Sequence, residues 1–175
     1  MPRVRPIVAL FPALLALCGC KDSLASGGTV QLLDNCDPAS FNAALGAGAC
    51  LHASSGGGMT LAAFNAELNA NHSVAAWDME PDQMTVREGS TFSVTNTGGE
   101  THTYTEVDEF GGGVVPALNT ASGNTTVAPE CADAGEFNAS IVASGQTRQH
   151  TFDERGTEKY QCCIHPWMRQ VVTVR

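Results

Sequence analysis

The stretch that decides the fold is KYQCCIHPWMRQVVTV, residues 159–174, close to the end of the 175-residue chain. It sets Cys162, His165 and Met168 close together and then runs into a segment rich in valine, which favours a strand. Thiolate, imidazole and thioether groups are ligands that suit copper. The stretch therefore predicts a metal-binding loop that leads into a strand.

The loop closely resembles the copper loop of the cupredoxins, the plastocyanin/azurin-like proteins, in its amicyanin form. That family has its remaining ligand histidine upstream, after an asparagine that ends a core strand. This chain has Asn96-Thr-Gly-Gly-Glu-Thr-His102 in that place. The resemblance covers residues 73–175 and implies that His102, Cys162, His165 and Met168 bind one copper ion.

The resemblance also implies roles for three residues around the metal. Asn96 is expected to hold the two ligand loops together by hydrogen bonds near the thiolate, as a residue behind the ligands. The His165 edge is expected near the surface in an apolar patch beside Trp167, where electrons would pass. The ligand chemistry agrees with an electron carrier, because a site of soft sulfur and imidazole ligands suits both copper oxidation states.

Two adjacent cysteines compete for the thiolate position. The family spacing of two residues before His165 selects Cys162, and strand alternation would point Cys163 to the opposite side. A disulfide between the two neighbours would be strained.

The other cysteines are expected to form disulfides. Cys36 with Cys50 would close a short loop, and Cys131 would take the spare member of the adjacent pair, Cys163. Four cysteines allow three pairings, so a bond between Cys36 and Cys131 stays an alternative.

The fold is predicted to be all-β, a cupredoxin-like Greek-key β-sandwich over residues 73–175 with an N-terminal extension over 29–72. Short runs rich in Val, Thr and aromatic residues, from SVAAW at 73–77 to QVVTV at 170–174, predict the strands. In the extension, Leu61, Phe64 and Leu68 recur at helical spacing after Thr60, a possible N-cap, and predict one short helix. Residues 117–129 predict a long irregular connection.

The N-terminus carries the pattern of an export signal. Residues 1–19 have a basic start, an apolar run and small residues, and the run is too short to favour a transmembrane helix. Leu17-Cys18-Gly19-Cys20 resembles a bacterial lipobox, which implies a lipid anchor on Cys20, a tether over 20–28 and a location at the cell envelope, periplasmic or on an outer face. Ordinary secretion without lipid is the alternative.

Composition restricts the partners. The formal net charge is −9, with 18 acidic and nine basic residues, which argues against nucleic acid and favours a basic protein such as a cytochrome. We expect a monomer that touches the membrane only through its anchor. Because four protein ligands leave no open position, the sequence predicts an electron carrier and no enzyme. A copper-buffering or delivery module and a purely structural sandwich are the alternatives.

Overall fold

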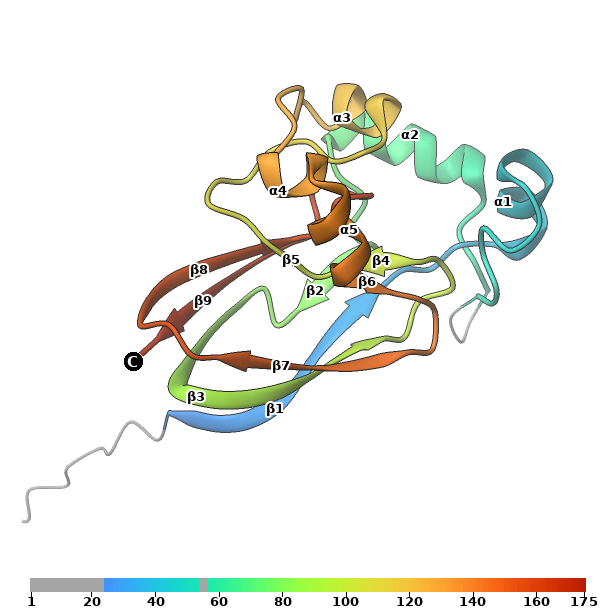
Figure 1. Cartoon of the computed structure of the whole chain (residues 1–175). Helices are drawn as coiled ribbons and strands as arrows, with labels where there is room; N and C mark the ends of the chain where they lie inside the picture. The colour runs from blue at the N-terminus through green and yellow to red at the C-terminus, as the bar shows by residue number, and fades with distance from the viewer. Residues whose placement is uncertain (1–23, 54–56) are drawn as a thin grey trace, which may run out of the picture.

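The computed structural model describes residues 24–53 and 57–175 (Figure 1). Its strands follow in chain order as β1 (Ala25–Leu33), β2 (Asp78–Glu80), β3 (Gln83–Asn96), β4 (His102–Thr103), β5 (Thr105–Glu106), β6 (Ile141–Val142), β7 (Thr147–Phe152), β8 (Gly156–Gln161) and β9 (Arg169–Val174). The helices are α1 (Pro38–Leu45), α2 (Leu61–Asn71), α3 (Pro116–Ala121), α4 (Pro129–Ala132) and α5 (Ala134–Ser140).

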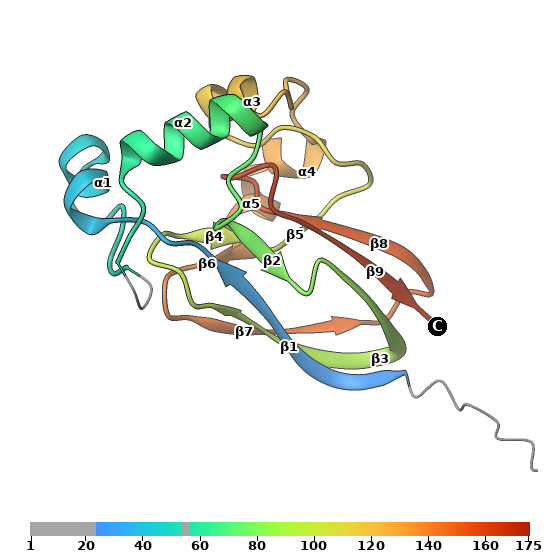
Figure 2. The same cartoon turned by 180° about the vertical axis from the view of Figure 1, so that it is seen from behind.

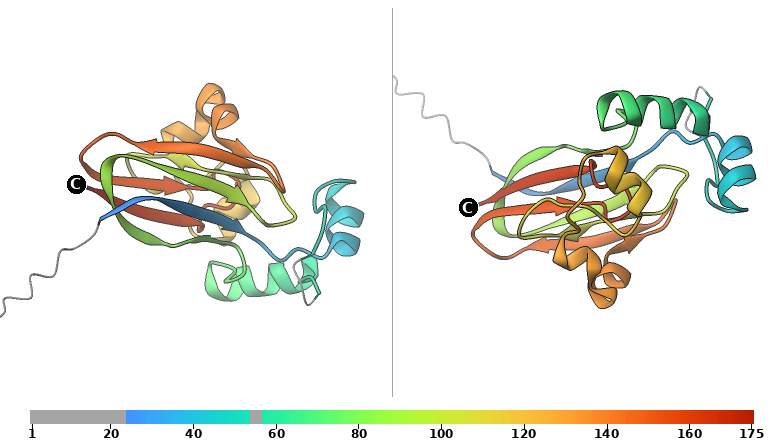
Figure 3. Two further views of the ribbon diagram at one scale, coloured as in Figure 1. Left: turned by 90° about the horizontal axis from the view of Figure 1, so that it is seen from below. Right: turned by 90° about the horizontal axis from the view of Figure 1, so that it is seen from above.

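Strand β3 connects the two layers of the sandwich. Its first residues pair in parallel with β9, from Gln83 opposite Val171 to Val86 opposite Val174. Its second half pairs in parallel with β1 and antiparallel with β7. The strand order is β2-β1-β3-β9-β8-β5, with β7 beside β3 and a small separate sheet of β4 and β6. The two layers are visible from below and above in Figure 3. The predicted all-β sandwich is thus confirmed.

Alternation along β3 explains why it sits in the core. Phe92, Val94 and Asn96 point inward and are buried, while Thr91 and its neighbours on the other face are more exposed. Across the exposed face, the Thr91 and Thr151 hydroxyls lie 2.9 Å apart. Cross-strand pairs of this kind fix the register of β3 against β7.

The helices gather at one end of the sandwich (Figures 1 and 2). The predicted helix is confirmed as α2: the Thr60 hydroxyl accepts from the Ala63 N–H, and Phe64 and Leu68 are buried. Helix α1 was not predicted, because its sequence is rich in small residues and turn formers. It begins at Pro38, and its N-cap Asp37 accepts from the Ser40 N–H, the usual chemistry of a helix start.

Three predicted segments differ in the structure. SVAAW is a turn that leads into β2, and Trp77 enters the core from it. The connection after residue 116 contains α3 and α4, so it is not wholly irregular. Strand β1 begins at Ala25, so residues 25–28 of the predicted tether belong to a strand, and β1 joins the main sheet although it precedes the 73–175 core.

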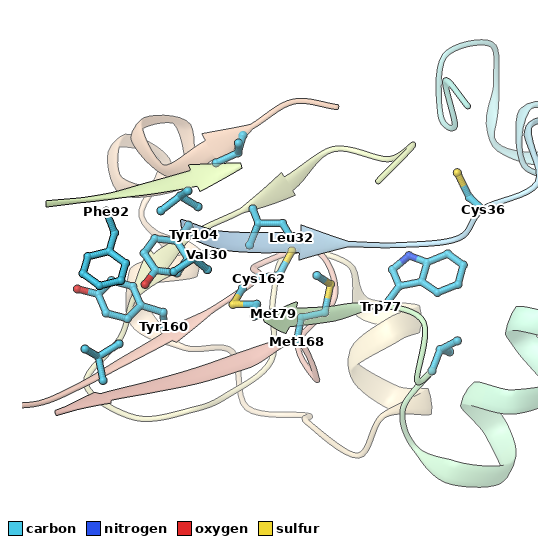
Figure 4. Close-up of a cluster of buried hydrophobic side chains, with 14 of the residues drawn as sticks. Val30, Leu32, Cys36, Trp77, Met79, Phe92, Tyr104, Tyr160, Cys162 and Met168 are labelled. Carbon is cyan, nitrogen blue, oxygen red and sulfur yellow. The ribbon is translucent and has the colours of Figure 1, made fainter. Parts of the chain in front are cut away.

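The buried core runs the length of the sandwich and ends at the helices. Figure 4 shows Tyr104 and Tyr160 at one end and Cys162, Met168 and Trp77 toward the other. At the helical end, the Phe64 ring centroid lies 4.7 Å from that of Trp77. The extension therefore shares one hydrophobic core with the sandwich.

The predicted signal peptide and Cys20 lie outside the described residues. Within 24–53 and 57–175, none of the helices has the length and apolar character needed to cross a membrane.

Candidate metal centre

Three side chains that could hold a metal ion meet at the helical end of the sandwich. His102 opens strand β4, Cys162 directly follows β8, and His165 lies in the loop between β8 and β9. The Cys162 sulfur is 3.8 Å from His102 Nδ1 and 3.8 Å from His165 Nδ1. All three are buried, and their candidate ligand atoms lie within 4.8 Å of one another. The structure thus brings together residues that are 60 positions apart in the sequence.

These separations fit a metal ion held between the three atoms. Protein metal–thiolate and metal–imidazole bonds are about 2.3 Å and about 2.0–2.1 Å long for zinc, which serves as a guide here. Set at a trigonal angle, such bonds place sulfur and nitrogen about 3.8 Å apart. The observed sulfur–nitrogen distances match this value, so the three atoms could hold a metal ion between them.

Met168 belongs to the same buried cluster as Cys162 (Figure 4). The loop that carries it is closed by two backbone hydrogen bonds, from Cys162 N–H to the Met168 carbonyl (3.0 Å) and from Met168 N–H to the His165 carbonyl (2.9 Å). The Met168 side chain is fully buried in this cluster.

The Cys162 sulfur lies in an environment that favours a thiolate. Backbone N–H groups of Thr103 and His165 point at it, at 3.4 and 3.5 Å. Burial alone would raise the pKa of Cys162, but its contacts with His102 and His165 outweigh burial and lower the pKa well below its ordinary value. The thiolate is the form that binds metal.

His102 is held from behind by a buried carboxylate. Its Nε2 lies 2.9 Å from Asp34 Oδ2, and both side chains are fully buried. Because Nδ1 faces the thiol, Nε2–H donates to Asp34, which fixes the tautomer and the ring orientation. Burial would raise the pKa of Asp34, but the hydrogen bond and charge of His102 lower it to about 2.

His165 has a similar neighbour in Glu100. The Glu100 Oε2 atom lies 3.4 Å from His165 Nε2 and accepts a 2.6 Å hydrogen bond from Trp77 Nε1. Without metal, burial would lower the pKa of His165, but the contacts with Cys162 and Glu100 raise it to about 10.

The structure places the His165 ring beside Trp167, as expected, and leaves little of the residue in contact with solvent. The residue is only 3% exposed. Its ring lies against two tryptophan rings, with centroid distances of 6.5 Å to Trp77 and 5.6 Å to Trp167. Phe64 of α2 packs on both of these rings. The two tryptophans therefore pack on His165 directly, and Phe64 of the extension supports both of them from behind.

Asn96 is buried behind the His102 loop. Its amide donates to the carbonyls of Glu100 and Val142, and its oxygen accepts from Gly98 N–H. These bonds shape the loop that carries His102.

The link between the two ligand loops, which the resemblance implied for Asn96, is made by Thr103. Its N–H points at the Cys162 sulfur, and its hydroxyl accepts from the Cys163 N–H at 2.7 Å.

Two disulfides brace the centre. The structure joins Cys36 to Cys50 and Cys131 to Cys163, which are the pairs considered from the sequence, and it leaves Cys162 as the free cysteine among the described residues. The second bond fixes α4 to the ligand loop. Cys163 thus points away from the site, as strand alternation indicates.

Sequence reasoning missed Asp34, Glu100 and Thr103. Glu100 and Thr103 flank His102 within two residues, and this proximity was the only signal they offered. Asp34 is 68 positions from His102, and no motif marks it. Two other histidines make contacts elsewhere: His72 contacts the Ala121 carbonyl and His150 contacts the Tyr160 hydroxyl.

A thiol and two imidazoles buried at one end of a β-sandwich define the class: a cupredoxin-type metalloprotein. Comparison with family models matches residues 66–175 to the copper binding proteins of the plastocyanin/azurin family. The chain belongs to this family, and copper is the family's cofactor.

Solved structures similar to this chain are themselves cupredoxins. The novel purple cupredoxin from Nitrosopumilus maritimus is 22% identical, over 61% of this chain and 93% of that one, with a TM-score of 0.38. An amicyanin variant in its Cu(I) form is 21% identical, over 59% and 78%, with a TM-score of 0.38. A reduced amicyanin variant is 22% identical, over 63% and 89%, with a TM-score of 0.39. No curated protein matches the chain.

Proposed function

We propose that the protein is a type 1 copper protein that carries one electron at a time, with His102, Cys162, His165 and Met168 as ligands. The observation that carries the proposal is the preformed triangle, in which the sulfur lies 3.8 Å from each of two imidazole nitrogens. Copper supplies the Cu(II)/Cu(I) couple when bound. The chain's own contribution is to hold these ligands in one geometry for both oxidation states.

Rigid support favours such a role. Thr103 ties one ligand loop to the other, and the Cys131–Cys163 disulfide anchors the residue next to the thiolate. Ligands locked by packing and hydrogen bonds rearrange little when an electron moves. The proposal thus follows from how the loops are fixed as well as from which ligands they carry.

We infer that electrons reach the site through Trp167, since the His165 edge is covered. The Trp167 ring is partly exposed, and its centroid lies 5.6 Å from the His165 ring. Replacing it with leucine keeps an apolar side chain at the surface but removes the aromatic ring. The Trp167→Leu protein should keep its absorption spectrum and transfer electrons more slowly. Transfer at the wild-type rate would contradict this route.

A copper-delivery module is the second function considered, and burial disfavours it. His102, Cys162 and His165 are all buried, and Met168 is fully enclosed. Ligands that hand a metal to another protein need access from outside. A carrier without enzymatic activity is therefore the preferred function.

The distinguishing experiment mixes ascorbate-reduced protein with an oxidised basic cytochrome and, separately, with an excess Cu(I) chelator. An electron carrier should reduce the cytochrome soon after mixing, and it should lose copper to the chelator at a far lower rate. Rapid copper loss without cytochrome reduction would favour delivery.

We further propose an envelope location with a lipid anchor on Cys20. The proposal is supported by the lipobox-like LCGC at 17–20 and the preceding signal-like segment. Palmitate labelling that disappears in Cys20→Ala is the expected result; an unlabelled wild-type protein made in a bacterial host would contradict the anchor.

A further inference from the structure

Each candidate ligand imidazole has a buried carboxylate at its outer nitrogen. Asp34 Oδ2 lies 2.9 Å from His102 Nε2, and Glu100 Oε2 lies 3.4 Å from His165 Nε2. The side chain of Asp34 is fully buried, and that of Glu100 is 10% exposed. Two carboxylates enclosed beside one metal centre are costly to bury, so their placement needs a reason.

Asp34 is held in place by the chain around it. It follows strand β1 directly, and its carboxylate accepts from the N–H groups of Cys36, Gly99 and Glu100 as well as from His102. These donors partly compensate the burial of its charge. The carboxylate is thus fixed in position before any metal binds.

The loop before His102 is built to admit this carboxylate. A Cβ at Gly98 would collide with the Asp34 carboxylate, and one at Gly99 would collide with the His52 carbonyl and the Cys36 sulfur. Only glycine permits so close an approach. The Cys36–Cys50 disulfide and the hydrogen bond from Leu51 N–H to the Gly99 carbonyl (2.8 Å) hold the extension against the loop.

Glu100 is fixed by different partners. The indole N–H of Trp77 donates to the same oxygen that faces His165, and Asn96 holds the Glu100 backbone carbonyl. Trp77 in turn packs on Phe41 and Phe64 of the extension. The extension thus supports both carboxylates, one directly and one through Trp77.

We propose that Asp34 and Glu100 are positioning residues that lower the reduction potential of the copper centre, and that the N-terminal extension exists in part to place them. The inference rests on the proposed copper function. A carboxylate hydrogen-bonded to a ligand imidazole makes the ring a stronger electron donor. Its negative charge also favours the oxidised site, which carries one more positive charge than the reduced site, and burial strengthens this attraction.

The step affected is a simple one-electron exchange. Cu(II) gains one electron from a reduced donor to give Cu(I), and no bond within the protein is made or broken. With the carboxylates present, the equilibrium lies further toward Cu(II), and the reduced protein gives up its electron more readily. Removing either charge therefore raises the potential.

The test measures the potential of the copper-loaded protein by spectroelectrochemistry at neutral pH. Glu100→Gln is the leading variant, because its amide oxygen can still accept from Trp77 while the charge is lost. We expect the Cu(II)/Cu(I) equilibrium to move toward Cu(I) by about tenfold, which is about 59 mV for a one-electron couple.

The matched control is Glu158→Gln. This change also removes a largely buried carboxylate, one that binds the Tyr160 hydroxyl on strand β8. It corrects for the loss of one negative charge anywhere in the protein. A Glu100→Gln shift no larger than that of Glu158→Gln would overturn the role of Glu100.

Asp34→Asn is the second variant. In this variant an amide N–H₂ group replaces one carboxylate oxygen, and in the wild type both oxygens accept from N–H groups. One N–H₂ group would therefore face an N–H donor, so some loss of stability is expected. The folded, copper-loaded fraction should still show a raised potential, and an unchanged potential would overturn the role of Asp34. A wild-type protein that binds copper without an intense charge-transfer band would refute the proposed function itself, whereas a coloured protein with unaltered potentials in both variants would refute only this inference.

Discussion

At the scale of single residues, placement decides chemistry more than residue type does. Cys162 and Cys163 are neighbours, yet one faces two imidazoles and the other closes a disulfide. His165 is buried near a thiol, whereas His150 is half-buried against a tyrosine hydroxyl. Among the described residues, His102, Cys162 and His165 form the cluster that could hold a metal ion.

His150 offers a prediction on pH dependence away from the metal. Burial lowers its pKa below the ordinary value of 6.5, partly opposed by the charge of Asp153. Its Nε2 lies 2.7 Å from the Tyr160 hydroxyl, which donates to Glu158. The unfolded chain therefore takes up this proton first, so the free energy of unfolding falls as pH drops from 6.5 toward the folded pKa.

His150→Gln should lose this part of the pH dependence. The slope of the free energy of unfolding against pH should differ from wild type by less than about 1.4 kcal/mol per pH unit, which is the value for one full proton. The difference is smaller because the ring is partly exposed and solvent screens it. Urea unfolding of both proteins at several pH values measures it. Parallel curves for the two proteins would show that His150 titrates alike when folded and unfolded.

At the scale of elements, helix α2 is the main support of the covered site. Phe64 is buried and packs against Phe41, Trp77 and Trp167, with centroid distances of 5.7, 4.7 and 5.9 Å. Phe64→Ala should lower the free energy of unfolding by about 3–5 kcal/mol. Urea denaturation followed by tryptophan fluorescence measures the loss.

Leu45→Ala is the matched control for that change. Leu45 ends α1 and is 59% exposed, so its truncation should cost less than about 0.5 kcal/mol. If Phe64→Ala lowered the free energy of unfolding as little as Leu45→Ala does, the extension would not unfold as one cooperative unit with the site.

Some of the helices and strands could be predicted from the sequence, and others could not. Helix α2 was predictable because Leu61, Phe64 and Leu68 repeat at helical spacing after a capping Thr60. Helix α1 was missed because its Pro, Ser and Asn residues also favour turns. SVAAW was misread as a strand because a short apolar run has no periodicity that separates strand from buried turn.

At the scale of the whole molecule, the meeting of His102, Cys162 and His165 was predictable, and the surroundings of this cluster were not. Cys162 and His165 share one loop and follow a spacing set by the family, so the sequence carried the signal. Asp34 acts across 68 positions of sequence through a register that only the fold defines. The tryptophan rings that pack on His165 are likewise supported by Phe64 of the extension, which lies mostly outside the family match at 66–175.

The charge of the whole chain predicts how a partner associates. With a formal net charge of −9, association with a basic cytochrome should be steered electrostatically. Raising ionic strength from about 0.01 M to about 0.15 M shortens the screening length from about 30 Å to about 8 Å. The second-order rate of cytochrome reduction should fall about tenfold or more over this range, measured by stopped flow. A rate independent of salt, or one equally fast with an acidic cytochrome, would exclude a basic partner selected by charge.

The central claim is that Cys162 is the thiolate of a copper centre, and the visible absorption spectrum after addition of Cu(II) tests it most directly. The wild type should show an intense thiolate-to-copper band that ascorbate bleaches. The double variant Cys131→Ser/Cys163→Ser should keep the band, although loss of its disulfide costs about 3–4 kcal/mol of stability. Cys162→Ser should be colourless. A coloured Cys162→Ser protein, or a colourless wild type, would contradict the account.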